Sequence, residues 1–290
     1  MIRTTIAAVA LVVTASPAAA KFASDRILVT TQGSGPDVIL VPGLTSSPAA
    51  FKYVAQDVPG YRYHFVQVKG FAGVPAEANA TGDVSKPVAE EIARYITAKH
   101  LKAPAIVGHS MGGTIAIMVA ARHPQAVSKL MIIDMPPFMG QMFGGPNATS
   151  ASITPMADRM LAGMAAMPAD ARRQQVDQMT GAMVRTDSER QAVLDSAHNS
   201  DQAVVSHAYR ELIVTDLRPE FGNITVPTSV LYVTPAGAPL TDAQIDAYMT
   251  ASYAGVKGAK LTRIPNSAHF IMYDARPRFA QELRTFLASN

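Results

Sequence analysis

The chain has 290 residues, a formal net charge of +3, seven histidines and no cysteine, so it forms no disulfide, no thiolate metal site and no cysteine nucleophile. Basic residues cluster no further than pairs such as Arg172-Arg173, which argues against nucleic-acid binding. No two histidines have the i, i+4 spacing of a helical metal site, and we expect neither a metal nor a cofactor.

The first twenty residues are predicted to be a secretory signal peptide, outside the fold. Arg3 gives a positive start, the apolar run from Ile6 to Val13 is too short to span a bilayer, and Ala18-Ala19-Ala20 provides small residues for cleavage. We expect cleavage after Ala20. The mature protein is then periplasmic or secreted, with no stable membrane anchor.

Apolar strand-like runs alternate with helix-like runs along most of the remaining chain, which is long enough to bury the core of one domain. This alternation predicts an α/β fold with a mostly parallel sheet and helices on both faces. Strands are predicted at residues 26–31, 37–41, 61–68, 105–108, 127–133, 229–233 and 260–264, and helices at 48–54, 84–100, 111–122, 243–254 and 276–289. Ligands of such sheets bind at the carboxyl ends of the strands, so the loops after Val41, Val107 and Ile133 should share one rim.

The strand pattern disappears between residues 139 and 223, where helices are predicted at 155–167, 168–184, 187–198 and 202–216. We predict that residues 139–223 form a helical cap, or lid, inserted after the strand that ends near Ile133. The core domain then consists of residues 21–138 and 224–290. Six methionines fit either an adaptable apolar pocket or ordinary packing between helices: Met156, Met160, Met164, Met167, Met179 and Met183.

The stretch Gly108-His109-Ser110-Met111-Gly112 joins a predicted strand to a predicted helix, the setting in which a sharp turn exposes a nucleophilic serine. We expect the two glycines to be needed because the turn brings backbones too close for side chains. A serine also needs a base. His269 is the candidate because it follows the last apolar strand in a loop of small residues, whereas His109 is held inside the turn and is expected to be structural.

Three stretches of the chain carry a family resemblance. These are the turn around Ser110, the sequence Pro42-Gly43-Leu44 after an apolar strand, and the sequence Ile264-Pro265-Asn266-Ser267-Ala268-His269-Phe270 before the last helix. In these stretches the chain resembles the α/β-hydrolase superfamily, in particular its serine esterases and lipases. The resemblance covers nearly all of residues 21–290. It implies that Ser110 is the nucleophile and His269 the base. It also implies that the backbone N–H groups of Leu44 and Met111 form the oxyanion hole.

The sequence offers two candidates for the acid that should orient the histidine. The superfamily commonly places it just after the strand at residues 229–233, but Thr234 to Leu240 contains no carboxylate and Ala238 occupies the expected place. Asp134 is the favoured replacement because some members of the superfamily take their acid from that strand end. Asp242 is the second candidate, although it also suits the start of a helix capped by Thr241. A chain in which neither carboxylate serves is the third interpretation.

The resemblance implies a serine hydrolase that cleaves a carboxylic ester or lactone with a small to medium apolar acyl group, with no nucleic-acid partner. One alternative is an amidase or an aminopeptidase of the proline-iminopeptidase type, which would use cap carboxylates such as Glu189, Asp195 or Glu211 to bind an amino group. Another alternative is a catalytically silent binding protein with the same fold. The absence of a carboxylate at Ala238, the expected acid position, supports this alternative.

Overall fold

The structure is a computed structural model that describes residues 22–235, 237 and 239–289. The predicted signal peptide at residues 1–20 and the predicted acid position Ala238 lie outside the described residues. Within the described residues, no helix combines the length and the apolar character that crossing a membrane requires.

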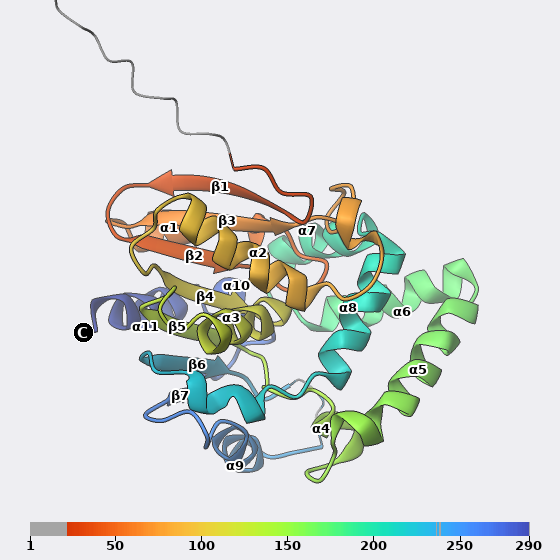
Figure 1. Cartoon of the computed structure of the whole chain (residues 1–290). Helices are drawn as coiled ribbons and strands as arrows, with labels where there is room; N and C mark the ends of the chain where they lie inside the picture. The colour runs from red at the N-terminus through yellow and green to blue at the C-terminus, as the bar shows by residue number, and fades with distance from the viewer. Residues whose placement is uncertain (1–21, 236, 238, 290) are drawn as a thin grey trace, which may run out of the picture.

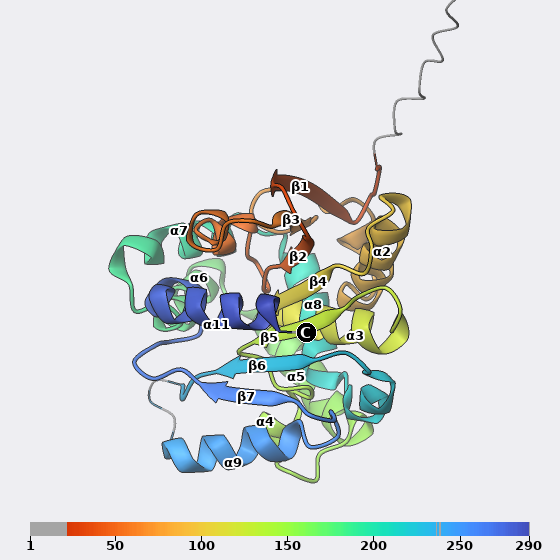
Figure 2. The ribbon, with the colours of Figure 1, turned by 90° about the vertical axis from the view of Figure 1, so that its left-hand side faces the viewer.

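The described residues contain one seven-stranded sheet with the strand order β1-β3-β2-β4-β5-β6-β7 (Figures 1 and 2). β1 runs antiparallel to β3, and all other neighbouring strands are parallel. The predicted mostly parallel sheet is therefore confirmed. The strands are β1 (Ile27–Gly33), β2 (Asp37–Val41), β3 (Arg62–Val68), β4 (Ala105–His109), β5 (Lys129–Ile133), β6 (Thr228–Tyr232) and β7 (Lys260–Arg263).

Helices cover both faces of the sheet, α2 and α3 on one side and α11 on the other (Figure 2). In β4, Ile106 packs on the side of α2 and α3, whereas Val107 packs on the side of α11. Because a strand buried on both faces has no solvent-facing side, its sequence reads as an unbroken apolar run. The core helices are η1 (Pro48–Phe51), α1 (Val54–Asp57), η2 (Glu77–Ala80), α2 (Ser85–Ala98), α3 (Met111–Arg122), η3 (Arg218–Asn223), α9 (Asp242–Ser252), α10 (Ile271–Asp274) and α11 (Arg276–Ala288).

Five α-helices and the 3-10 helix η3 lie between β5 and β6 in the described chain, and α5 and α6 extend away from the sheet (Figure 1). α5 packs on α8 and α6 on α7. α5 buries only Ile153 and Ala157, and α6 buries no residue fully. The insert is therefore attached to the core mainly through α7 and α8. Its helices are α4 (Gln141–Gly144), α5 (Ser150–Ala166), α6 (Ala169–Ala182), α7 (Asp187–His198) and α8 (Gln202–Val214).

Helix α5 begins five residues earlier than the sequence indicates, since the predicted start was Pro155 and the helix starts at Ser150. Thr149 caps it, and the side chains of Thr149 and Ser152 each accept a hydrogen bond from the other's backbone N–H. This reciprocal cap satisfies the N–H groups of Thr149 and Ser152 and fixes the start of the helix at Ser150, ahead of Pro155.

Candidate active site

Ser110 stands at the sharp turn between β4 and α3. Its backbone has φ 53° and ψ −125°, a conformation that is strained for a residue with a side chain. Two hydrogen bonds hold the turn: the Ser110 N–H donates to the carbonyl of Ile133 at 2.8 Å, and the Gly113 N–H donates to the carbonyl of Ser110 at 2.7 Å. The serine is partly exposed at the carboxyl end of its strand.

The glycines on either side of Ser110 leave no space for a side chain. A Cβ at Gly108 would overlap the carbonyl of Gly112, and a Cβ at Gly112 would overlap the carbonyl of Val41 at the end of β2. The expected close approach of strand and helix backbones is therefore confirmed at both positions.

His269 and Asp134 lie side by side at the same edge of the sheet. Nδ1 of His269 is 2.6 Å from Oδ2 of Asp134. The other carboxylate oxygen of Asp134 accepts a hydrogen bond from the Val233 N–H at 3.1 Å, and the Asp134 N–H donates to the carbonyl of Leu231 at 2.7 Å. The backbone at the end of β6 and just after it thus holds Asp134 toward the imidazole, although Asp134 directly follows β5.

Asp242, the second candidate for the acid, binds other groups. Its carboxylate accepts a hydrogen bond from the Thr234 hydroxyl at 2.6 Å and pairs with Arg263 at 2.7 Å. Thr241 caps α9 in a reciprocal pair with Gln244, so Asp242 occupies the first turn of that helix. The structure therefore brings Asp134, and not Asp242, to the histidine.

His109 is buried inside the turn and contacts the backbone of His269. Its Nε2 donates to the carbonyl of His269 at 3.1 Å, and the two ring centroids are 4.5 Å apart. Burial lowers the pKa of the His109 imidazole well below its ordinary value, and the neighbouring His269 ring acts in the same direction. A neutral imidazole with its proton on Nε2 satisfies this geometry.

The loop after β2, which contains the predicted oxyanion donor Leu44, packs against the serine turn. A Cβ added at Gly43 would lie 2.9 Å from Cβ of Ser110 and 3.2 Å from Nδ1 of His109. Met111, the other predicted donor, is the first residue of α3. The first N–H groups of a helix have no partner within the helix, which makes them available to a developing anion.

The carboxylates that an aminopeptidase would need already have partners. Glu189 accepts hydrogen bonds from Lys52 Nζ and from the Tyr53 hydroxyl, both at 2.7 Å. Glu211 accepts three backbone N–H groups at the start of α2, at 2.6–2.9 Å. Asp195 accepts from the side chain of Gln191 at 2.8 Å. Glu189 and Glu211, which are both buried, are therefore not left to bind a substrate's amino group, whereas Asp195 is exposed on α7.

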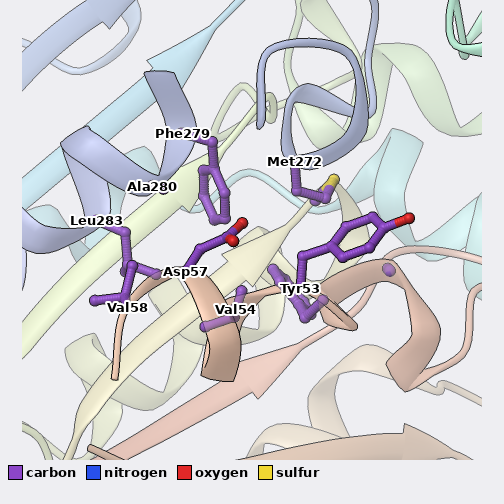
Figure 3. Close-up of a pocket in the computed structure, with 10 residues that line it drawn as sticks. Tyr53, Val54, Asp57, Val58, Met272, Phe279, Ala280 and Leu283 are labelled. Atoms are coloured by element: carbon purple, nitrogen blue, oxygen red, sulfur yellow. The ribbon is translucent and has the colours of Figure 1, made fainter. Parts of the chain in front are cut away.

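Two hollows lined by described residues lie outside the candidate site. The hollow in Figure 3, between Val54 of α1 and Phe279 of α11, measures about 10 Å³, barely the space of one water molecule. A hollow of about 550 Å³ is lined by Asp37, Arg62 and Lys129, the first residues of β2, β3 and β5, and so lies at the opposite edge of the sheet. Ser110 and His269 line neither hollow. Among the described residues, no three histidine, aspartate or glutamate side chains gather as metal ligands.

A sequence profile of the alpha/beta hydrolase family matches residues 38–282. The chain belongs to this family. The resemblance inferred from the serine turn and the histidine loop is thereby confirmed, together with the fold that it implies. The esterase from Exiguobacterium antarcticum shares that fold with a TM-score of 0.74 and 23% identity, and the match covers 91% of this chain and 96% of that one.

Curated relatives in the alpha/beta hydrolase family include pimeloyl-acyl-carrier-protein methyl ester esterases. The one from Shewanella sp. (strain MR-7) is 29% identical over 39% of this chain, and the match spans only 39% of that relative's length. The one from Chromobacterium violaceum is 28% identical, and the match covers 79% of this chain and 91% of the relative. The similarity thus extends over most of the chain in one case and over a shorter part in the other.

Sequence reasoning missed two groups that bind the backbone around His269. It assigned His109 to the turn but not to the carbonyl of His269, and it gave no role to Asp274, which accepts the Ala268 N–H at 3.0 Å. The first contact joins segments 160 positions apart, so no local pattern indicates it, whereas the second spans only six residues.

Proposed function

We propose that this chain is a serine hydrolase that cleaves carboxylic esters through an acyl-enzyme formed on Ser110. The observation that carries the proposal is the 2.6 Å separation of His269 Nδ1 and Asp134 Oδ2 at the end of the strand next to the serine turn. A carboxylate at Nδ1 fixes the tautomer that leaves Nε2 free to accept the serine proton.

In the proposed reaction, His269 accepts the hydroxyl proton of Ser110 as its oxygen attacks the ester carbonyl. The backbone N–H groups of Leu44 and Met111 stabilise the oxyanion, and one such donor is worth about 3–4 kcal/mol in the transition state. His269 then protonates the departing alcohol. Water, deprotonated by His269, releases the acid, while Asp134 orients and stabilises the imidazolium.

We propose an ester or lactone with a small to medium apolar acyl group as substrate, since a lactone is a cyclic ester that the same steps open. The named relatives that act on methyl esters favour an ester over an amide. We propose further that the insert, residues 139–223, covers the site. Met156 and Met160 pack against the cluster that contains Phe138, and Met183 packs against the core. Ordinary packing accounts for these three methionines and leaves Met164, Met167 and Met179 as candidates for the acyl pocket.

An aminopeptidase is disfavoured because Glu189 and Glu211 are buried and already bonded. A silent binding protein is disfavoured because Asp134 supplies a carboxylate that the loop after β6 lacks. A screen with short p-nitrophenyl esters, acyl lactones and aminoacyl anilides separates the three functions. We expect turnover of esters or lactones, no release from the anilides, and labelling of Ser110 by a serine-directed phosphonate.

The Ser110→Ala variant should lose both turnover and labelling, with Ser46→Ala as the matched serine control because its hydroxyl donates to the carbonyl of Leu44 and leaves the Leu44 N–H unchanged. Unchanged turnover in Ser110→Ala, or labelling of another residue, would refute the mechanism. Absence of activity and of labelling in the wild-type chain would favour the binding protein.

We also propose that the protein is exported and that its mature chain begins at Lys21. Expression of the full chain in a Gram-negative host, followed by fractionation and N-terminal sequencing, tests this. A cytoplasmic chain that retains residues 1–20 would contradict it.

A further inference from the structure

The backbone around His269 is fixed on both sides by contacts that reach the insert. We call residues 264–270 the histidine loop and residues 183–186, between α6 and α7, the hinge segment. The Phe270 N–H of the histidine loop donates to the carbonyl of Met183 in the hinge segment at 3.2 Å. The Ala268 N–H donates to Asp274, whose carboxylate also binds the hinge segment.

Asp274 divides its two oxygens between these segments. Oδ2 accepts the Ala268 N–H at 3.0 Å, and Oδ1 accepts the N–H and the hydroxyl of Thr186, both at 2.8 Å. The Arg185 N–H lies 3.0 Å from Oδ1 and 3.1 Å from Oδ2. One half-buried carboxylate therefore joins four donors from two segments that lie more than eighty positions apart in the chain.

Thr186 gives a second indication that this link matters. It stands at the N-cap of α7, where a threonine side chain normally accepts a hydrogen bond from its own helix, but its hydroxyl makes no cap bond and donates to Asp274 instead. The Thr186 hydroxyl thus binds the Asp274 carboxylate in place of the N-terminus of α7.

We propose that Asp274 is a positioning residue for the base: it ties the histidine loop to the hinge segment, and this link keeps His269 aligned. The inference rests on the proposed serine hydrolase mechanism. Asp274 touches neither the serine nor the imidazole in any contact described above, and it acts through the backbone on either side of His269. Catalytic groups displaced by about 1 Å lose roughly a hundredfold in rate, so a loosened loop reduces turnover.

The test is Asp274→Asn, which preserves size but replaces one acceptor oxygen with an NH2 donor. The amide cannot accept from both segments, so one side of the link is lost. We expect kcat for an ester substrate to fall about tenfold or more with KM changed less than about threefold, because alignment of the base matters in the transition state and not in ground-state binding. Thr186→Val, which removes one of the four donors, should lower kcat by a smaller factor.

The matched control is Glu211→Gln. Glu211 is also a buried carboxylate that joins the insert to the core through backbone N–H groups, but it contacts the start of α2 and not the histidine loop. We expect it to lower the melting temperature without changing kcat. If Asp274→Asn proves too unstable to isolate, Thr186→Val carries the test alone, and an unchanged kcat in that variant overturns the proposal.

Hydrogen–deuterium exchange separates this inference from the proposed function, because it needs no substrate. In Asp274→Asn we expect faster exchange in peptides covering the histidine loop and in peptides covering the hinge segment, and in Glu211→Gln in neither. Unchanged exchange, or an altered loop with kcat intact, overturns the proposal. If the wild-type chain lacks ester turnover, the proposed function fails, whereas faster exchange at both segments still establishes the link.

Discussion

His109 and His269, 160 positions apart in the chain, are joined by a hydrogen bond of 3.1 Å from Nε2 of the first to the backbone carbonyl of the second. The donor is part of the serine turn and the acceptor is the proposed base. The nucleophile and the base are therefore held in register by a direct contact between their own segments, in addition to the sheet that supports both.

The first prediction concerns pH. Burial keeps the pKa of His109 well below the ordinary value of 6.5. At a pH between the folded and unfolded pKa values, His109 therefore binds a proton in the unfolded chain but not in the folded chain. The contribution of neutral His109 to the free energy of unfolding is fully present above pH 6.5. It is lost as the pH decreases from the unfolded pKa to the folded pKa. We expect the free energy of unfolding of the wild-type chain to fall from pH 7.5 to pH 5, and that of His109→Phe to fall less.

Urea unfolding at several pH values measures this difference. His109→Phe also leaves the His269 carbonyl without its donor, so at pH 7.5 it should be less stable by about 1–3 kcal/mol. His64 is also buried with a lowered pKa, but it is present in both proteins and cancels in the comparison. Parallel pH profiles for the two proteins would show that His109 is not held neutral.

The second prediction separates the two candidate acids. Asp134→Asn should lower kcat about 10³–10⁴-fold, because the amide can donate to Nδ1 of His269 and favour the unproductive tautomer. Asp242→Asn should leave kcat within about twofold, since Asp242 binds Thr234 and Arg263 instead. Steady-state kinetics on one ester substrate compares both variants. A larger loss in Asp242→Asn than in Asp134→Asn would reverse the assignment.

Local pattern was enough to predict the sheet, most helices and the setting of Ser110. Unbroken apolar runs mark strands buried on both faces, and the helix over residues 111–122 is found with the predicted bounds. The start of α5 was missed because Pro155 reads as a helix start, whereas the reciprocal cap of Thr149 and Ser152 outweighs it.

The contacts that join distant segments could not be read from the sequence. The sequence leaves two candidate acids, Asp134 and Asp242, and favours Asp134 only through the family resemblance, because the contact of Asp134 with His269 spans 135 positions. The backbone N–H that directs its carboxylate belongs to Val233, just after β6 and 99 positions away. The same holds for Asp274, because three of its four donors belong to Arg185 and Thr186, 88 or 89 positions away.

The third prediction tests the close backbone contact at the serine turn. Gly112→Ala places a methyl group on the carbonyl of Val41, so the turn has to open. We expect a loss of stability of at least about 1–3 kcal/mol and a loss of turnover. Gly163→Ala is the control, because a Cβ added at this glycine of α5 would meet no atom within 4 Å outside its own helix backbone. Alanine also stabilises a helix by about 1 kcal/mol relative to glycine.

Thermal unfolding monitored by circular dichroism compares the two alanine variants with the wild-type chain. The control should melt at or above the wild-type temperature, and Gly112→Ala below it. Wild-type melting and activity in Gly112→Ala would mean that the turn does not need the glycine.

The last prediction assigns Glu189 to the architecture of the insert and not to substrate binding. Burial on its own raises the pKa of this carboxyl, but the hydrogen bonds from Lys52 and Tyr53 outweigh burial, and the pKa lies below the ordinary value of 4.5. Glu189→Gln keeps the shape and weakens both bonds, so we expect a loss of about 1–3 kcal/mol at pH 7. Because a lowered pKa contributes stability only while the carboxyl is ionised, the difference between the two proteins should shrink as the pH falls below 4.5.

Urea unfolding at pH 7 and pH 4 measures this effect, and ester kinetics provide the control. The KM of Glu189→Gln for an uncharged ester should equal that of the wild-type chain, since Lys52 and Tyr53 already occupy the carboxylate. If the substrate instead carried an amino group bound by Glu189, the substitution would raise KM for aminoacyl anilides and leave stability unchanged. That result would restore the aminopeptidase as the function of this chain.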